Sequence, residues 1–172
     1  MALRTDLSGT KKITVLGLLL AAGIVLNLAE NMIPVFTVLP GGKLGLANVV
    51  TMLVMLWFGP LTALVLGVLR SLLTGILSGM ATMAVYGGVG TVLSVAAMWL
   101  FFRLFREKVS MAGLSMLGAF FFNVGQIAVA AAVVHNWQLF RYLPVLTLLS
   151  TICGLFTGIV AGKTAEKRIV GD

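Results

Sequence analysis

Six apolar runs, separated by short polar stretches, occupy most of this 172-residue chain. They lie at about 13–33, 44–58, 60–78, 80–104, 111–134 and 143–164. A helix needs about 20 apolar residues, within a range of about 17–25, to cross a hydrocarbon core of ~30 Å. Five runs reach that length, whereas the second is short and is separated from the third only by Gly59-Pro60. The pattern predicts one all-α domain, residues 1–172, forming a compact bundle of six transmembrane helices, or five if the second run is re-entrant.

The overall composition indicates lipid as the main solvent of the chain. Hydrophobic residues make up 60%, charged residues 10%, and the mean hydropathy is +1.12, whereas roughly a quarter of an ordinary soluble domain is charged. The first run is long for the core of a signal peptide and no small-x-small cleavage site follows it, so we expect it to remain. Cys153 is the single cysteine, which excludes a disulfide framework and a thiol pair for metal or redox chemistry.

The basic residues predict how the bundle is oriented. Lys43 and Arg141 fall on one side of the six spans, and Arg70 lies within a span. An excess of Lys and Arg marks the cytoplasmic side. We therefore expect a protein of the bacterial cytoplasmic membrane with both termini in the cytoplasm and the polar hinge at 28–48 on the outer side. Because the positive charges are spread between apolar runs, they indicate topology and no nucleic-acid partner. The nine basic residues on the cytoplasmic side are Arg4, Lys11, Lys12, Arg103, Arg106, Lys108, Lys163, Lys167 and Arg168.

Arg70 is the polar residue that most needs an explanation. The third run starts near Pro60, so at about 1.5 Å per residue Arg70 lies ~15 Å into the bilayer. An arginine at that depth costs at least about 2.5–3.5 kcal/mol and should face a partner or an aqueous cavity. Two interpretations remain open: a structural pairing with Glu30 or with helix-end carbonyls, and contact with a bound ligand.

Further polar side chains occupy the outer half of the predicted bundle. Asn27, Glu30 and Asn31 are spaced i, i+3, i+4 and share a helix face. Asn123 and Gln126 share a face of the fifth span at similar depth. A single amide of this kind is explained by an interhelical hydrogen bond worth about 0.6–2 kcal/mol. Their common depth above Arg70 favours a shared pocket open to the outside.

Several reaction chemistries lack their residues in this sequence. The aspartates are Asp6 and Asp172, one near each end, whereas handling a diphosphate through Mg²⁺ requires clustered carboxylates. The segment "PGGKLG" lacks the spacing of a P-loop. One histidine, His135, makes no closed metal site. We therefore expect no catalysis, no metal and no cofactor in this chain.

Three segments resemble a known family of small bacterial membrane proteins. They read "AENMIPVFTVLPGGKLGLANVVTML", "LRSLLTGIL" and "FFNVGQIAVAA". The resemblance is to the six-helix proteins labelled both Gx transporter and heptaprenyl diphosphate synthase component I. These are related to the substrate-binding (S) components of energy-coupling factor (ECF) transporters. The hinge departs from the compact "IPVPGGKLG" of that family, because Phe36–Leu39 are inserted.

The two labels imply two functions. As an S component, the chain would capture a vitamin-like or amphipathic small molecule from outside for ATP-driven import. It would dock on a transmembrane coupling subunit, with ATP and Mg²⁺ used by two cytosolic ATPase subunits. We favour this interpretation from the sequence, since transporters place midplane charge beside a pocket. The alternative is a noncatalytic membrane subunit or scaffold for heptaprenyl diphosphate or quinone synthesis.

Under the transport interpretation, each polar group has an expected role. Arg70 and Lys43 would contact an anionic or carbonyl group of the ligand, and Tyr86 would stack on it. Hydrogen bonds would come from Asn27, Glu30, Asn31, Asn48, Asn123 and Gln126. The small residues Gly17, Ala21 and Ala22 would form the face for the coupling subunit. A helix-packing face is predicted for the last span, where small residues recur at four-residue spacing, namely Gly154, Gly158 and Gly162.

Overall fold

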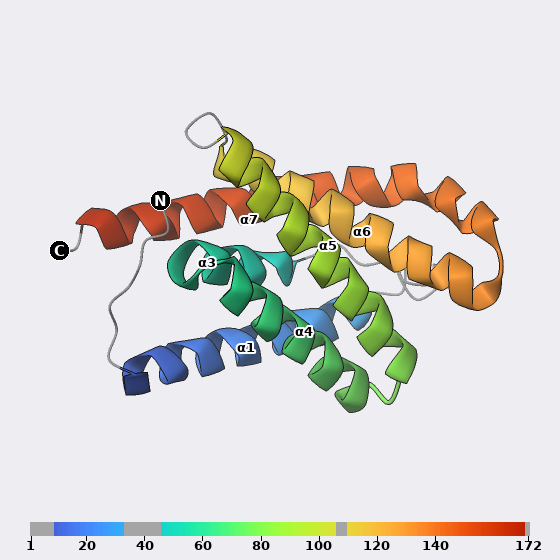
Figure 1. The fold of residues 1–172 in the computed structure, drawn as a ribbon, viewed down its shortest axis with the longest axis horizontal. Helices are drawn as coiled ribbons and strands as arrows, with labels where there is room; N and C mark the ends of the chain where they lie inside the picture. Colours follow the sequence, from blue (N-terminus) through green and yellow to red (C-terminus); the bar gives the residue numbers. More distant parts are fainter. Residues whose placement is uncertain (1–8, 33–45, 106–109, 171–172) are drawn as a thin grey trace.

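The computed structural model describes residues 9–32, 46–105 and 110–170, and the regular structure in these ranges is entirely helical (Figure 1). This confirms the predicted all-α bundle. Most of the predicted bounds agree with the structure to within a few residues. The elements are α1 (Gly9–Asn31), α3 (Asn48–Phe58), α4 (Pro60–Leu77), α5 (Ala81–Phe105), α6 (Met111–Val134), the 3₁₀ helix η2 (Trp137–Tyr142) and α7 (Leu143–Val170).

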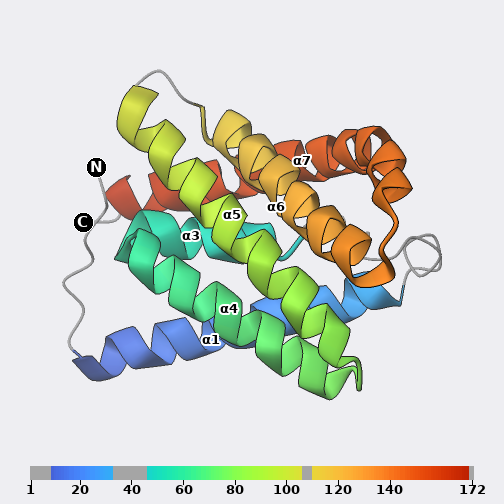
Figure 2. The same cartoon turned by 45° about the vertical axis from the view of Figure 1, so that its right-hand side comes forward.

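Five helices surround the sixth. Contacts run from α1 to α4, from α4 to α5, from α5 to α6 and from α6 to α7, and α3 contacts all five. Within the described ranges, α1 and α7 share no contact, so the ring of five helices is not closed between its first and last members. Figures 1 and 2 show α3 in the middle of the bundle, with the start of α1 and the end of α7 at the same end of the molecule.

The central helix α3 is too short to cross a bilayer. Its 11 residues span about 16 Å at 1.5 Å per residue, roughly half of a hydrocarbon core. The other five main helices are long and apolar enough to cross. The described residues therefore form five full-length candidate spans and one half-length helix, which corresponds to the short second run of the sequence.

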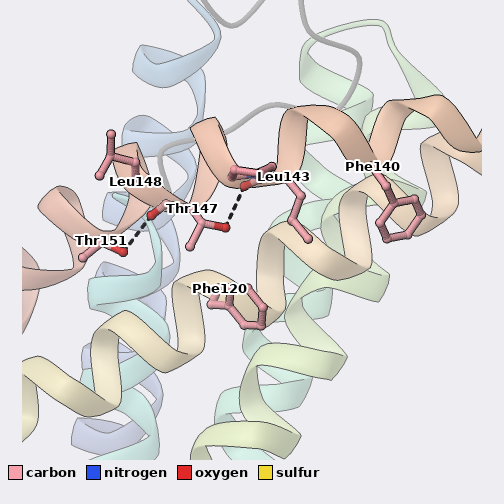
Figure 3. Close-up of a pocket in the computed structure, with 7 residues that line it drawn as sticks. Phe120, Phe140, Leu143, Thr147, Leu148 and Thr151 are labelled. Atoms are coloured by element: carbon pink, nitrogen blue, oxygen red, sulfur yellow. Dashed lines mark hydrogen bonds between the residues drawn. The ribbon is translucent and has the colours of Figure 1, made fainter.

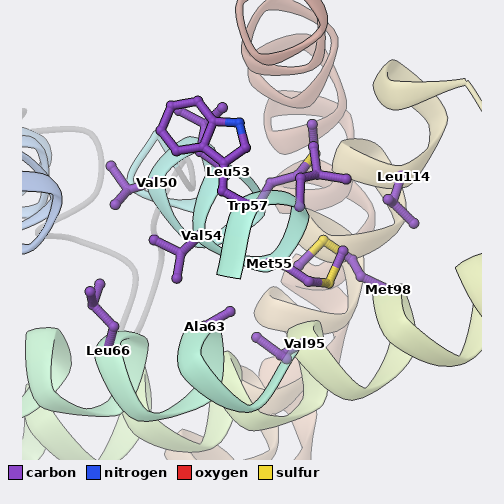
Figure 4. Packing of buried hydrophobic residues seen from close by; sticks show 12 residues of the cluster. Val50, Leu53, Val54, Met55, Trp57, Ala63, Leu66, Val95, Met98 and Leu114 are labelled. Atoms are coloured by element: carbon purple, nitrogen blue, oxygen red, sulfur yellow. The ribbon is translucent and has the colours of Figure 1, made fainter. Parts of the chain in front are cut away.

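Burial of α3 creates the hydrophobic core of the molecule. Nine of its 11 residues are buried. Figure 4 shows Val54 and Met55 of α3 beside Ala63 of α4 and Met98 of α5. The outward faces of the long helices are also apolar: Ile13, Leu61 and Ile76 are 73%, 74% and 75% exposed. An apolar exterior around a partly polar interior is the arrangement that lipid favours, and it identifies a multi-pass membrane protein.

Local sequence signals set the helix ends. Gly59 adopts φ 92°, ψ 169°, a conformation that glycine tolerates, and Pro60 then begins α4. Ser110 caps α6 by accepting a hydrogen bond from the Gly113 backbone N–H at 3.0 Å. His135 ends α6 in the left-handed region at φ 53°. In the structure, the single histidine therefore caps the end of α6 through its backbone.

Candidate functional site: a buried polar cluster at the start of α3

Arg70 joins three helices at the start of α3. Its side chain is fully buried on α4, and its Nη1 donates to the backbone carbonyl of Ala47 and to the Thr51 hydroxyl, the latter at 3.2 Å. Ala47 is the N-cap residue of α3, and Thr51 lies one turn further along the chain. On α1, a Cβ added at Gly23 would lie 2.8 Å from Cδ of Arg70, so the arginine stem crosses α1 where no side chain is present. Arg70 thus bonds to a carbonyl at a helix end, which is one of the two structural pairings expected from the sequence.

Glu30 approaches the same helix start from α1. It is 2% exposed, and its Oε1 accepts a hydrogen bond from the backbone N–H of Leu46. It also lies close enough for its negative charge to act on the Arg70 guanidinium. A carboxylate beside a helix N-terminus is stabilised by the helix dipole. Glu30 and Arg70 together therefore fix where α3 begins.

Two amides complete this group of side chains. Asn27 Nδ2 donates to the Thr74 hydroxyl at 3.5 Å, a long bond that links α1 to α4. Asn48 is 4% exposed, and its Nδ2 has no hydrogen-bond partner among the described residues. The group is called the α3-start cluster below, and it consists of Asn27, Glu30, Asn48, Thr51, Arg70 and Thr74.

Asn123 and Gln126 form a separate polar pair in α6. Asn123 Nδ2 donates to the Leu146 carbonyl of α7 at 3.4 Å, and its Oδ1 has no partner in the described part of the chain. Gln126 is fully buried beside Gly90 of α5, and neither atom of its amide has a partner there. Neither residue is hydrogen-bonded to Arg70, so the structure places the predicted pocket residues in two groups, one at α1–α3–α4 and one at α5–α6–α7.

The other predicted binding and docking residues in the described ranges are Tyr86 and the small residues of α1. Tyr86 is half-buried on α5. Gly17, Ala21 and Ala22 are exposed on α1, and a Cβ added at Gly17 would have no neighbour within 4 Å. Lys43 and the side chain of Asn31 lie outside the described residues, and so do the surroundings of Gly162.

Two of the predicted packing glycines lie where α7 meets α6. A Cβ added at Gly154 would be 3.0 Å from the Met116 Cα, and one added at Gly158 would be 2.4 Å from the Ala112 Cα. Both distances are shorter than an ordinary carbon–carbon contact of about 3.5–4.0 Å. The absence of side chains at these positions lets the two backbones approach.

A groove in the surface lies between α6 and the η2–α7 junction (Figure 3). Its volume is ≈ 460 Å³. The Thr147 and Thr151 hydroxyls donate to carbonyls of their own helix, each at 2.7 Å, so these side chains add little polarity to the groove. No residue of the α3-start cluster lines it. The lining residues are Phe120, Phe140, Leu143, Pro144, Thr147, Leu148 and Thr151.

Sequence reasoning missed this groove and part of the cluster. The groove is lined mainly by apolar residues, which in a membrane helix look the same as lipid-facing ones. Gly23 carried a usable signal, because it precedes Asn27 by four residues and Glu30 by seven and so shares their helix face. Thr51 and Thr74 carried no signal that separates them from threonines bonded to their own helix.

The fold and the buried polar groups define a class of protein, and a comparison with known proteins gives the family. Long apolar helices around a polar interior define the class: a polytopic helical membrane protein. Within that class, the family model described as heptaprenyl diphosphate synthase component I matches residues 19–164. That match covers most of the chain, and the chain belongs to this family. No curated protein and no solved structure matches it.

Proposed function

We propose that this chain is the noncatalytic membrane subunit of a heptaprenyl diphosphate synthase system. The family match over residues 19–164 carries the proposal. Its description numbers the protein as component I, which implies a second component. The sequence has five acidic residues, and its two aspartates lie near opposite ends, so the carboxylates for Mg²⁺-diphosphate chemistry are assigned to that partner.

The apolar groove supports a role in handling the prenyl chain. Its volume of ≈ 460 Å³ is within the range of about 300–1,000 Å³ typical of small-molecule sites. A chain of isoprene units is apolar and partitions into lipid, so a subunit within the bilayer is a suitable acceptor for it. In this proposal the partner forms the carbon–carbon bonds, and the groove takes up part of the growing chain.

Co-purification and reconstitution test this function. The tagged chain is extracted in mild detergent, bound proteins are identified, and prenyl synthase activity is measured with and without the chain in vesicles. We expect a soluble prenyl diphosphate synthase to co-purify and its product length or rate to change. If no synthase associates and its activity is indifferent to the chain, the proposal is wrong.

Matched tryptophan variants locate the effect. Thr147→Trp fills the groove, whereas Val145→Trp changes a neighbouring side chain that is 53% exposed and does not line the groove. We expect Thr147→Trp to reduce the effect of the chain on the product, and Val145→Trp to preserve it. Equal effects of the two variants would contradict a role for the groove.

A second function, the S component of an ECF importer, is favoured by one observation on α1. Gly17, Ala21 and Ala22 are exposed together, and small residues let a helix of another subunit approach closely. In this alternative a coupling subunit and two ATPases would associate, and the chain would bind a vitamin-like molecule. The same co-purification distinguishes the two functions: ATPases and a coupling subunit support import, and a prenyl synthase supports the first proposal.

A further inference from the structure

The guanidinium of Arg70 is only partly used by the protein. Nη1 is held by the Ala47 carbonyl and the Thr51 hydroxyl, whereas Nε and Nη2 have no hydrogen-bond partner among the described residues. Nε and Nη2 form one edge of the planar group, and their two N–H bonds match the two oxygens of a carboxylate or phosphate. Arg70 is thus anchored at one corner, and its bidentate edge is left without an acceptor.

The surroundings of this edge favour a negative group. The start of α3 is buried, with Ala47 1% and Asn48 4% exposed, and no side chain caps it. A helix N-terminus is the positive end of the helix dipole and binds anions readily. Asn48 in the first turn of α3 adds a further donor, Nδ2, that has no partner in the described ranges.

Glu30 has its own hydrogen-bond partner at the start of α3. Its Oε1 accepts from the Leu46 N–H, and no acceptor in the described part of the protein reaches Nε or Nη2 of Arg70. Glu30 does act on Arg70 through its charge, so an incoming anion also meets this carboxylate. The donors available to that anion are the Nε–Nη2 edge of Arg70 and Nδ2 of Asn48.

We propose that the α3-start cluster binds one oxyanion group, a carboxylate or a phosphate, of a small amphipathic molecule. The Nε–Nη2 edge of Arg70 receives two oxygens of that group, and Asn48 Nδ2 donates to it. This inference does not rest on the proposed synthase role, since it concerns binding by the isolated chain.

Three probes with the same apolar chain test this site: farnesyl diphosphate, farnesoic acid and farnesol. Thermal unfolding of the purified full chain in detergent is followed with each probe. We expect at least one anionic probe to raise Tm saturably, with farnesol having no such effect. A shift by the diphosphate alone assigns a phosphate ligand, and a shift by the acid alone assigns a carboxylate. Absence of any anion-dependent shift overturns the proposal.

Conservative variants separate binding from folding. Arg70→Lys keeps the charge and a donor for the Ala47 carbonyl but lacks the bidentate edge. It should weaken the anionic probe about ten-fold or more. Asn48→Asp keeps the shape but adds a negative charge, and it should weaken the probe similarly. Arg103→Lys, on the exposed end of α5, is the matched control and should bind as wild type.

Each variant is first compared with wild type by Tm without probe, so that a folding defect is recognised before binding is scored. If Arg70→Lys and Asn48→Asp fold and bind the anionic probe as wild type does, the site is wrong even when wild type binds. Because no synthase partner is present, the outcome is independent of whether the chain acts as component I.

Discussion

Arg70 illustrates how a charged side chain is stabilised inside an apolar bundle. Its depth and its need for a partner followed from its position in an apolar run. The identity of its partner could not be predicted in the same way, because the Ala47 carbonyl becomes available only where α3 begins. Every residue has a backbone carbonyl, so the sequence does not indicate which one accepts from Arg70. The start of α3 is also hard to locate, because it follows a polar hinge of many residues.

Removing the arginine should destabilise the protein. Arg70→Met keeps the length but removes the donors to Ala47 and Thr51, together with the positive charge that acts on Glu30. Leaving a buried hydrogen-bonding group without its partner costs about 1–3 kcal/mol, and more where the partner is charged. We expect a clearly lower Tm in detergent, measured by size-exclusion chromatography after heating. Arg103→Met, which removes an exposed arginine stacked on Trp99, is the control, and an equal loss there would contradict the explanation.

Two glycines of α1 provide a second test at the residue scale. Gly23→Ala places a methyl group 2.8 Å from the Arg70 Cδ, and the guanidinium bonds restrict how far that side chain can move. We expect a destabilisation of about 1–3 kcal/mol, typical of overpacking. Gly17→Ala meets nothing within 4 Å and should be neutral or slightly stabilising. Thermal unfolding of the two variants side by side measures the difference.

At the scale of helices, sequence and structure agree best where end signals are local. Gly59-Pro60 and Ser110 specify boundaries by their own backbone preferences or capping bonds. The central place of α3 could not be predicted, because an apolar run in a membrane protein faces lipid or a core equally well. The division of the polar residues into two groups depends on helix pairing, which the depth of each residue does not determine.

The contact of α6 with α7 is open to a direct test. Gly158→Ala puts a Cβ 2.4 Å from the backbone Cα of Ala112, and backbone yields less readily than a flexible side chain. We expect a loss of stability of about 1–3 kcal/mol or more. Ile159→Ala alters the adjacent residue, which is 50% exposed, and should have a smaller effect. The comparison is made by thermal unfolding in the same detergent.

At the scale of the whole molecule, the two ends of the helix bundle differ, and this difference bears on the orientation of the protein in the membrane. The start of α1 and the end of α7 lie at the same end of the molecule, and η2 lies at the other end of α7 (Figure 2). This arrangement is compatible with both termini on one side of the membrane. The side itself is predicted from the distribution of basic residues, which places η2 outside.

Cysteine labelling checks this orientation. After Cys153→Ser, single cysteines are introduced at the exposed positions Thr10 and Gln138. A membrane-impermeant maleimide should label the Gln138→Cys variant in intact cells and the Thr10→Cys variant only after permeabilisation. The reverse pattern would place the termini outside and would invert the assignment of the hinge.

The half-length of α3 also bears on how the chain is made. An 11-residue helix is shorter than the about 17–25 residues that an insertion machinery accepts as a span. We expect α3 to enter the bilayer together with α4, as a hairpin turning at Gly59-Pro60. Yet α3 also packs against α7, which is synthesised after it. The packing around α3 is therefore complete only after α7 has been made, whereas the Arg70 bonds to Ala47 and Thr51 require only α4 and the start of α3.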